Sequence, residues 1–128
     1  MEVILSTRPR VLLADDYPAM VTALSRLLSL DCEVVGSVAD GSALLDAAQR
    51  LRPDVIVLDL NLPTVSGLEA CRQIAQTNPD IKVIVVTAAL DPAKRQESIE
   101  AGASGFVSKL TAFSDLLSTI KRLGVDRG

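Results

Sequence analysis

Four short apolar runs in this chain end in polar residues whose side chains can do chemistry. These residues are Asp15, Asp16, Asp59, Thr87 and Lys109. The chain has no histidine, which excludes a histidine-based catalytic triad, a histidine metal site and a histidine acid–base catalyst. Any chemistry must therefore be carried by carboxylates, hydroxyl groups and lysine.

The composition predicts a single domain that does not bind nucleic acid directly. A chain of 128 residues can bury a core, and aliphatic residues must build it because aromatic residues make up only 2%. The net charge is −3 and Lys and Arg are scattered, which argues against a nucleic-acid-binding surface. We expect no membrane span and no signal peptide. Cys32 and Cys71 lack metal-ligand spacing, which favours free thiols in a reducing cytoplasm.

Strand-like and helix-like segments alternate five times along the chain. The predicted strands are 10–14, 33–38, 55–58, 82–86 and 105–108. The predicted helices begin near Pro18 and then cover 41–50, 66–76, 92–101 and 111–123. This alternation predicts an α/β sandwich with a parallel central sheet, preceded by an extension over residues 1–8 and followed by a tail over 123–128. The helix at 92–101 has few apolar residues, so we expect it to be weakly held.

The five polar residues are expected to meet at one edge of the sheet, where the carboxyl ends of parallel strands bind ligands. Two carboxylates about 4 Å apart repel by about 4 kcal/mol at an effective dielectric constant of 20, so the acids need positive charge among them. Lys109 supplies one such charge, and a divalent cation, for which Mg²⁺ is well suited, would supply the rest. Taken singly, each residue is better explained by a structural role, as a helix cap, a turn residue, a strand end or a solvated side chain. Only their occurrence together at the same edge favours a site.

The sequence resembles the receiver domain of two-component response regulators over about residues 9–122. The matching stretches are VLLADD, PDVIVLDLNLPTVSGLE, VIVVTA and EAGASGFVSK. Within that family the pattern resembles the NarL/FixJ type, whose receivers precede helix-turn-helix DNA-binding domains. The resemblance implies a doubly wound, flavodoxin-like (βα)5 fold with strand order 2-1-3-4-5.

Asp59 matches the phosphoacceptor of this family, so the resemblance implies that its carboxylate takes up a phosphoryl group. Asp16 would bind Mg²⁺ directly, Asp15 would act through water, and Asp59 and the backbone carbonyl of Asn61 would complete the protein ligands. Lacking histidine, the chain would receive the group from a sensor histidine kinase, a phosphotransfer protein or a small-molecule donor. Such a receiver is not an enzyme in the usual sense, because it catalyses only its own phosphorylation and dephosphorylation.

The resemblance also implies how the phosphoryl group would be bound. Thr87 would hydrogen-bond its oxygens, Lys109 would pair with them, and the small side chain of Ala88 would leave room for the donor. Pro63 and Gly67 match the loop that shapes the rim of the site, with Gly67 free to take a positive φ.

A switch involving Thr87 and Phe106 is implied as well. Thr87 would swing toward the phosphoryl group and Phe106 would fill the vacated space, the alternative being a permanently buried Phe106. We expect the surface formed by residues 92–101, 105–108 and 111–123 to change most on activation. Leu110 follows Lys109 where many receivers have proline preceded by a cis bond. A non-proline cis bond costs about 3–4 kcal/mol, which favours a trans bond and leaves the reach of Lys109 open.

Three other functions compete with this interpretation. A phosphatase of the haloacid-dehalogenase type also uses a strand-end aspartate, but it generally needs a second acid where Asn61 stands. A flavodoxin-type FMN binder needs a phosphate-binding loop where Asp15 and Asp16 would repel the phosphate. A receiver that is never phosphorylated would keep the fold and serve as a docking module. The resemblance leaves open a homodimer and a C-terminal DNA-binding effector domain, outside this chain, that controls transcription.

Overall fold

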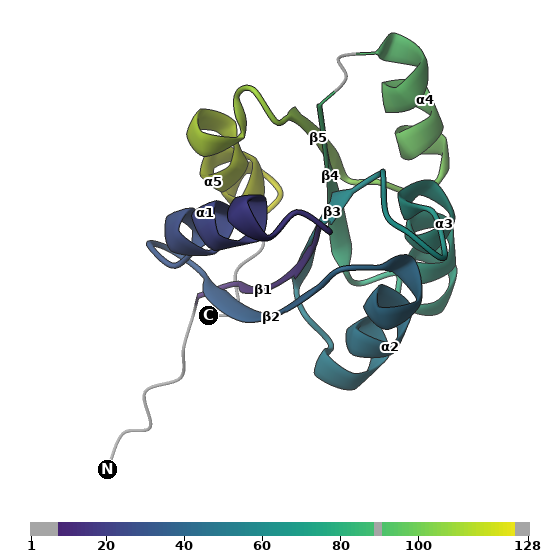
Figure 1. Cartoon of the computed structure of the whole chain (residues 1–128), viewed down its shortest axis with the longest axis horizontal. Coiled ribbons are helices and arrows are strands. Elements are labelled where there is room, and N and C mark those ends of the chain that lie inside the picture. The colour runs from purple at the N-terminus through teal and green to yellow at the C-terminus, as the bar shows by residue number, and fades with distance from the viewer. Residues whose placement is uncertain (1–7, 89–90, 125–128) are drawn as a thin grey trace.

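Five strands and five helices alternate along the computed structural model, which describes residues 8–88 and 91–124 (Figure 1). The strands are β1 (Arg10–Ala14), β2 (Glu33–Val38), β3 (Val55–Asp59), β4 (Lys82–Thr87) and β5 (Gly105–Ser108). The helices are α1 (Pro18–Leu28), α2 (Gly41–Leu51), α3 (Gly67–Thr77), α4 (Pro92–Glu100) and α5 (Ala112–Arg122). All the predicted elements are present, and their ends lie within one residue of the predicted ends.

The strands form one parallel sheet in the order β2-β1-β3-β4-β5. This order confirms the doubly wound, flavodoxin-like α/β fold. Because β3 lies between β1 and β4, its last residue, Asp59, is placed at the middle of the carboxyl edge of the sheet. Asp59 pairs with Val86 of β4, so Thr87 lies one residue further along the neighbouring strand.

Strand β3 is apolar from Val55 to Leu58, and both of its faces are covered by helices (Figure 1). Val55 and Val57 belong to the core under α1 and α5, whereas Ile56 and Leu58 belong to the core under α2 and α3. All five residues of β3 are buried, including Asp59. The strand therefore holds Asp59 on a backbone that is packed on both sides.

Helix α4 buries fewer of its side chains than any other described helix. Ser98 is its only buried residue, and its Oγ donates a hydrogen bond to the carbonyl of Lys94 at 2.8 Å. Ile99 is 49% exposed, so it adds little to the core. This burial supports the expectation of a weakly held helix, because helices gain most of their stability by packing an apolar face.

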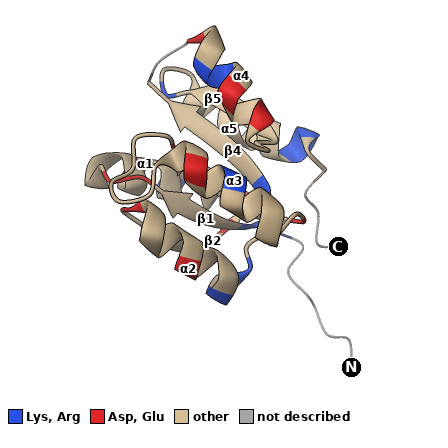
Figure 2. Ribbon diagram, turned by 90° about the vertical axis from the view of Figure 1, so that its right-hand side faces the viewer, with Lys and Arg blue, Asp and Glu red and all other residues tan. Residues whose placement is uncertain are grey.

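The described surface has mixed charge. Figure 2 shows Lys and Arg spread over several elements and interspersed with Asp and Glu. Among residues 8–88 and 91–124, no helix combines the length and the apolar character that a bilayer crossing requires. Most of the predicted N-terminal extension, residues 1–7, and residues 125–128 of the predicted tail lie outside the described residues.

Candidate functional site

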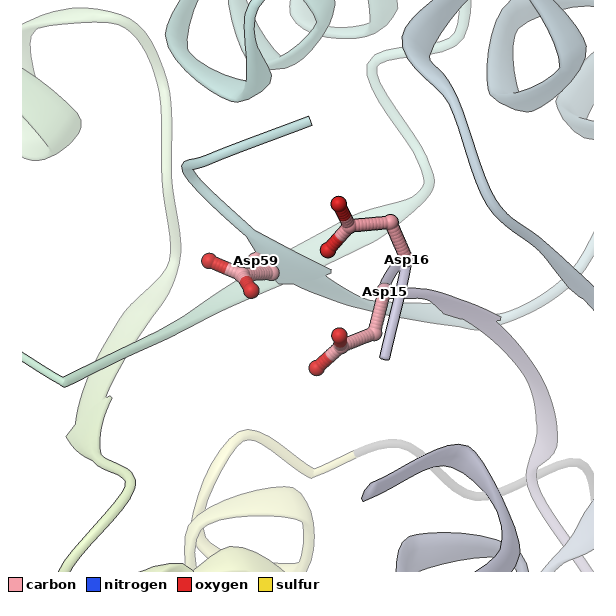
Figure 3. Close-up of side chains that lie close together, drawn as sticks. All are labelled: Asp15, Asp16 and Asp59. Carbon is pink, nitrogen blue, oxygen red and sulfur yellow. The ribbon is translucent and has the colours of Figure 1, made fainter. Parts of the chain in front are cut away.

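Three carboxylates lie together at the carboxyl edge of the sheet (Figure 3). Asp15 and Asp16 directly follow β1, and Asp59 ends the neighbouring strand β3. One carboxylate oxygen from each of the three residues lies within 4.8 Å of the other two. Asp15 and Asp59 are buried whereas Asp16 is exposed, so solvent reaches the cluster at Asp16.

Lys109, which directly follows the edge strand β5, joins the two buried acids. Its Nζ donates a hydrogen bond to Oδ2 of Asp59 at 2.8 Å and lies 3.5 Å from Oδ2 of Asp15. The loop after β5 therefore reaches the site even though Leu110 follows Lys109. The Lys109–Leu110 peptide bond is trans, as the sequence favoured.

The electrostatics of this cluster show a shortage of positive charge. Burial raises the pKa of Asp15, and the nearby charge of Asp59 raises it further, while the amide of Tyr17 and Lys109 act in the opposite direction. Burial alone would lower the pKa of Lys109, but its hydrogen bond to Asp59 and the charges of Asp59 and Asp15 outweigh that effect and raise it. The acids thus keep Lys109 protonated, but its single positive charge does not neutralise all of their negative charge.

These donors fit a divalent cation that prefers oxygen ligands. Three carboxylates face one ammonium group, which leaves two negative charges uncompensated among these side chains. Carboxylate oxygens without imidazole or thiolate ligands suit Mg²⁺, which keeps several waters and needs only one or two protein carboxylates. The residues present therefore fit the Mg²⁺ that the sequence predicted.

The loop between β3 and α3 begins against Asp59. The amide of Asn61 donates to Oδ1 of Asp59 at 3.0 Å, so both carboxylate oxygens of Asp59 have a donor. Gly67 does not take the positive φ that the sequence suggested, because the glycines that do are Gly102 and Gly124. Instead, a Cβ at Gly67 would come within 2.6 Å of the carbonyl oxygen of Asp59. Close packing against β3 is therefore what requires glycine here.

Thr87 ends β4 at the same edge and is buried. Its carbonyl accepts a hydrogen bond from the amide of Lys109 at 2.8 Å, which ties the β4 and β5 ends together. Ala88, the next residue, is exposed. The structure thus brings Thr87, Ala88 and Lys109 to the edge that carries the acids.

Phe106 lies within β5 and is partly buried. With Asp91, Arg95, Asp115 and Arg122, it lines a groove of about 560 Å³ between α4, β5 and α5. Room for a change in the Phe106 side chain therefore exists on the groove side.

Tyr17 contributes to the site in a way that sequence reasoning missed. Its amide donates to Oδ1 of Asp15 at 2.9 Å and fixes that carboxylate, while its side chain is 60% exposed. The contribution comes from the backbone, so the residue type carried no signal for it. However, an aspartate whose carboxylate accepts a hydrogen bond from the amide two residues later forms a turn that is common at the start of a helix.

We expect Asp15→Asn to make the metal-free protein more stable at neutral pH. The folded-state pKa of Asp15 lies above its ordinary value of 3.8, so the charged carboxylate costs stability at neutral pH. That cost is relieved as the pH falls through the folded-state pKa toward 3.8, so the advantage of the variant should shrink over this interval. Urea unfolding with a chelator, at neutral and successively lower pH, measures the difference.

Asp46→Asn is the matched control, because Asp46 is exposed and its ion pair among the described residues is with Arg50 on its own helix. It should change stability little at any of these pH values. An Asp15→Asn protein less stable than wild type at neutral pH would contradict the account of the cluster.

Comparison with known proteins identifies the family. The family model of the response regulator receiver domain matches residues 11–121. The chain is 34% identical over 114 residues to the response regulator GacA of Pseudomonas viridiflava, covering 88% of this chain and 53% of that protein. It is 37% identical over 114 residues to the response regulator MprA of Mycobacterium leprae, covering 89% of this chain and 50% of that protein. The chain thus spans about half the length of these relatives.

Solved structures agree with this match. A two-component response regulator of the LuxR family from Aurantimonas sp. superimposes with a TM-score of 0.87 at 30% identity, covering 91% of this chain and 85% of that one. The signal receiver domain of the putative response regulator NarL from Mycobacterium tuberculosis gives a TM-score of 0.87 at 27% identity, covering 92% and 97%. Sequence, fold and the acidic cluster agree, and the chain belongs to the family of response regulator receiver domains.

Proposed function

We propose that this chain is the phosphorylation-activated receiver of a two-component phosphorelay, with Asp59 as the phosphoacceptor. The observation that carries the proposal is the position of Asp59, which is buried at the strand edge, within reach of Asp15 and Asp16 and hydrogen-bonded to Lys109. Asp16 would hold Mg²⁺ directly, Asp15 would act through water, and Asp59 and the Asn61 carbonyl would complete the protein ligands.

The Asp59 carboxylate would act as a nucleophile toward phosphorus. Its oxygen forms the new bond to phosphorus, while the bond from phosphorus to the imidazole nitrogen of the donor, or to the acetate oxygen of acetyl phosphate, breaks. Mg²⁺, when held by these residues, would supply positive charge that offsets the charge on the transferring group. Lys109 holds the carboxylate in place before transfer and can pair with the phosphoryl oxygens afterwards, together with the hydroxyl of Thr87.

The donor would be a sensor histidine kinase or a phosphotransfer protein, since the chain has no histidine of its own. Such a partnership would place the chain in the cytoplasm. By analogy with the LuxR-family structures, a C-terminal DNA-binding domain would carry the output to transcription. A homodimer is compatible with this scheme. The receiver would span residues 9–122, between the predicted extension and tail.

Phosphorylation of wild-type protein by acetyl phosphate tests the proposal. Intact mass should increase by one phosphoryl group with Mg²⁺ and should not change with a chelator, because the metal offsets the charge on the transferring group. Failure to gain mass from acetyl phosphate or from any histidine-phosphorylated donor would favour the unphosphorylated docking module instead. Steady release of phosphate from monoesters would instead favour a phosphatase.

Activation is expected to change the surface formed by α4, β5 and α5. Helix α4 buries only Ser98, and Phe106 borders the groove between these elements, so little packing opposes a rearrangement. Amide hydrogen exchange with and without an acyl-phosphate mimic should show its largest differences over residues 91–122. Unchanged exchange over this range, with changes elsewhere, would contradict this part of the proposal.

A further inference from the structure

Thr64, in the loop between β3 and α3, has a backbone conformation that threonine rarely adopts. Its φ is 67°, in the left-handed region. A β-branched side chain is sterically disfavoured there, whereas glycine adopts this conformation freely. The local sequence therefore does not explain the conformation, and contacts made by the side chain must hold it.

Those contacts join the loop to the N-terminus of α2. The Thr64 hydroxyl donates to Oδ1 of Asp40 at 3.2 Å and accepts from the amide of Ser42 at 3.1 Å, across 24 and 22 residues of sequence. The same oxygen of Asp40 accepts from the amide of Ala43 at 2.8 Å. Thr64 and Asp40 together thus cap the first turn of α2, whose amides have no partner within the helix.

The backbone of the loop lies directly against the same turn. The amide of Gly41 donates to the carbonyl of Pro63 at 3.0 Å. A Cβ at Gly41 would come within 1.9 Å of the carbonyl oxygen of Val65, so only glycine allows this approach. The Thr64 hydroxyl therefore acts at the point where the loop and α2 are in closest contact.

The other end of the loop is part of the acidic site. The amide of Asn61 donates to Oδ1 of Asp59, and the amide of Gly67 donates to the carbonyl of Leu60 at 3.0 Å. Between these points the loop has no regular secondary structure, and Thr64 holds its middle, three residues after Asn61. Movement of the loop at Thr64 would therefore be passed along a short backbone to Asn61.

We propose that Thr64 is a positioning residue for the metal site: it anchors the loop to α2 and so keeps the backbone carbonyl of Asn61 placed to bind Mg²⁺. The inference rests on the proposed function, since only there is the Asn61 carbonyl a ligand. The hydrogen bonds of the Thr64 hydroxyl go to Asp40 and Ser42, so Thr64 would act on the metal site through the loop and not as a ligand.

Thr64→Val and Thr64→Ser test this inference through Mg²⁺ affinity, measured by calorimetric titration. Valine matches the shape of threonine but loses both hydrogen bonds, so Mg²⁺ should bind on the order of tenfold more weakly, as when outer partners of a metal ligand are removed. Serine keeps the hydroxyl and should restore wild-type affinity. Thr77→Val is the matched control, because Thr77 is also exposed and its hydroxyl donates to Gln73, at the C-terminal end of α3.

Amide hydrogen exchange in metal-free buffer gives a second readout that does not depend on Mg²⁺. Exchange over residues 61–66 and at the start of α2 should be faster in Thr64→Val and unchanged in Thr77→Val. Wild-type Mg²⁺ affinity in Thr64→Val, in a wild type that binds Mg²⁺, would overturn this inference and leave the proposed function standing. A wild type that does not bind Mg²⁺ would overturn the proposed function and this inference with it.

Discussion

Asp59→Asn is expected to abolish phosphoryl uptake while leaving the protein folded. The amide of asparagine is not a nucleophile toward phosphorus, so we expect no residual phosphorylation at position 59. The amide of Asn61 can still donate to the side-chain oxygen, and the loss of one acid from the cluster offsets the loss of its charge pairing with Lys109. Stability should therefore change by about 1 kcal/mol or less, within the usual range of a conservative substitution.

The measurement is intact mass after incubation with acetyl phosphate and Mg²⁺, together with urea unfolding of the same samples. Asp46→Asn, which removes an exposed acid on α2, should be phosphorylated like wild type. Uptake of a phosphoryl group by Asp59→Asn at the wild-type level would mean that another side chain is the acceptor.

Lys109→Met is expected to slow phosphorylation by about a hundredfold, the usual cost of removing one preorganised donor from a charge-stabilising site. Methionine keeps the apolar length of the side chain but cannot donate to Asp59 or pair with transferring oxygens. The same change should cost about 1.5–3 kcal/mol of stability, because a buried carboxylate loses a hydrogen bond from a charged donor. Mg²⁺ affinity should be retained, since Lys109 offers no oxygen ligand and its removal leaves the site more negative.

Initial rates with acetyl phosphate at saturating Mg²⁺, combined with calorimetric Mg²⁺ titration, separate these effects. Lys82→Met is the matched control, because Lys82 is also partly buried but begins β4 at the opposite edge of the sheet. If Lys109→Met bound Mg²⁺ more weakly but was phosphorylated at the wild-type rate at saturating Mg²⁺, Lys109 would have a structural role only.

Most of the fold could be predicted because local signals agreed with the tertiary structure. Val55 to Leu58 are apolar at every position, and the structure shows that alternate residues serve two different cores. Pro18 starts α1 where the sequence predicted a helix start, and Asp40 caps α2, a position at which aspartate is common. The convergence of Asp15, Asp59 and Lys109 followed from the geometry of a parallel sheet, although their chemical roles stay predictions.

The remaining features depend on contacts between segments that are distant in the sequence. Whether Lys109 would reach Asp59 past Leu110 was open, and the trans peptide bond proves compatible with a 2.8 Å contact. Gly67 was expected to serve backbone flexibility, but its role is set by the approach of β3. The Thr64 anchor had no signal, because it exists only where the loop meets a helix formed more than 20 residues earlier.

The most direct test of the central claim is to locate the phosphoryl group after acetyl phosphate treatment. Reduction with borohydride converts a phosphorylated aspartate to homoserine, which peptide mass spectrometry can assign to a position. We expect homoserine at position 59 in samples treated with acetyl phosphate and Mg²⁺, and not in samples treated with a chelator. Homoserine at Asp15 or Asp16, or a phosphoryl group on a hydroxyl, would contradict the account of this site.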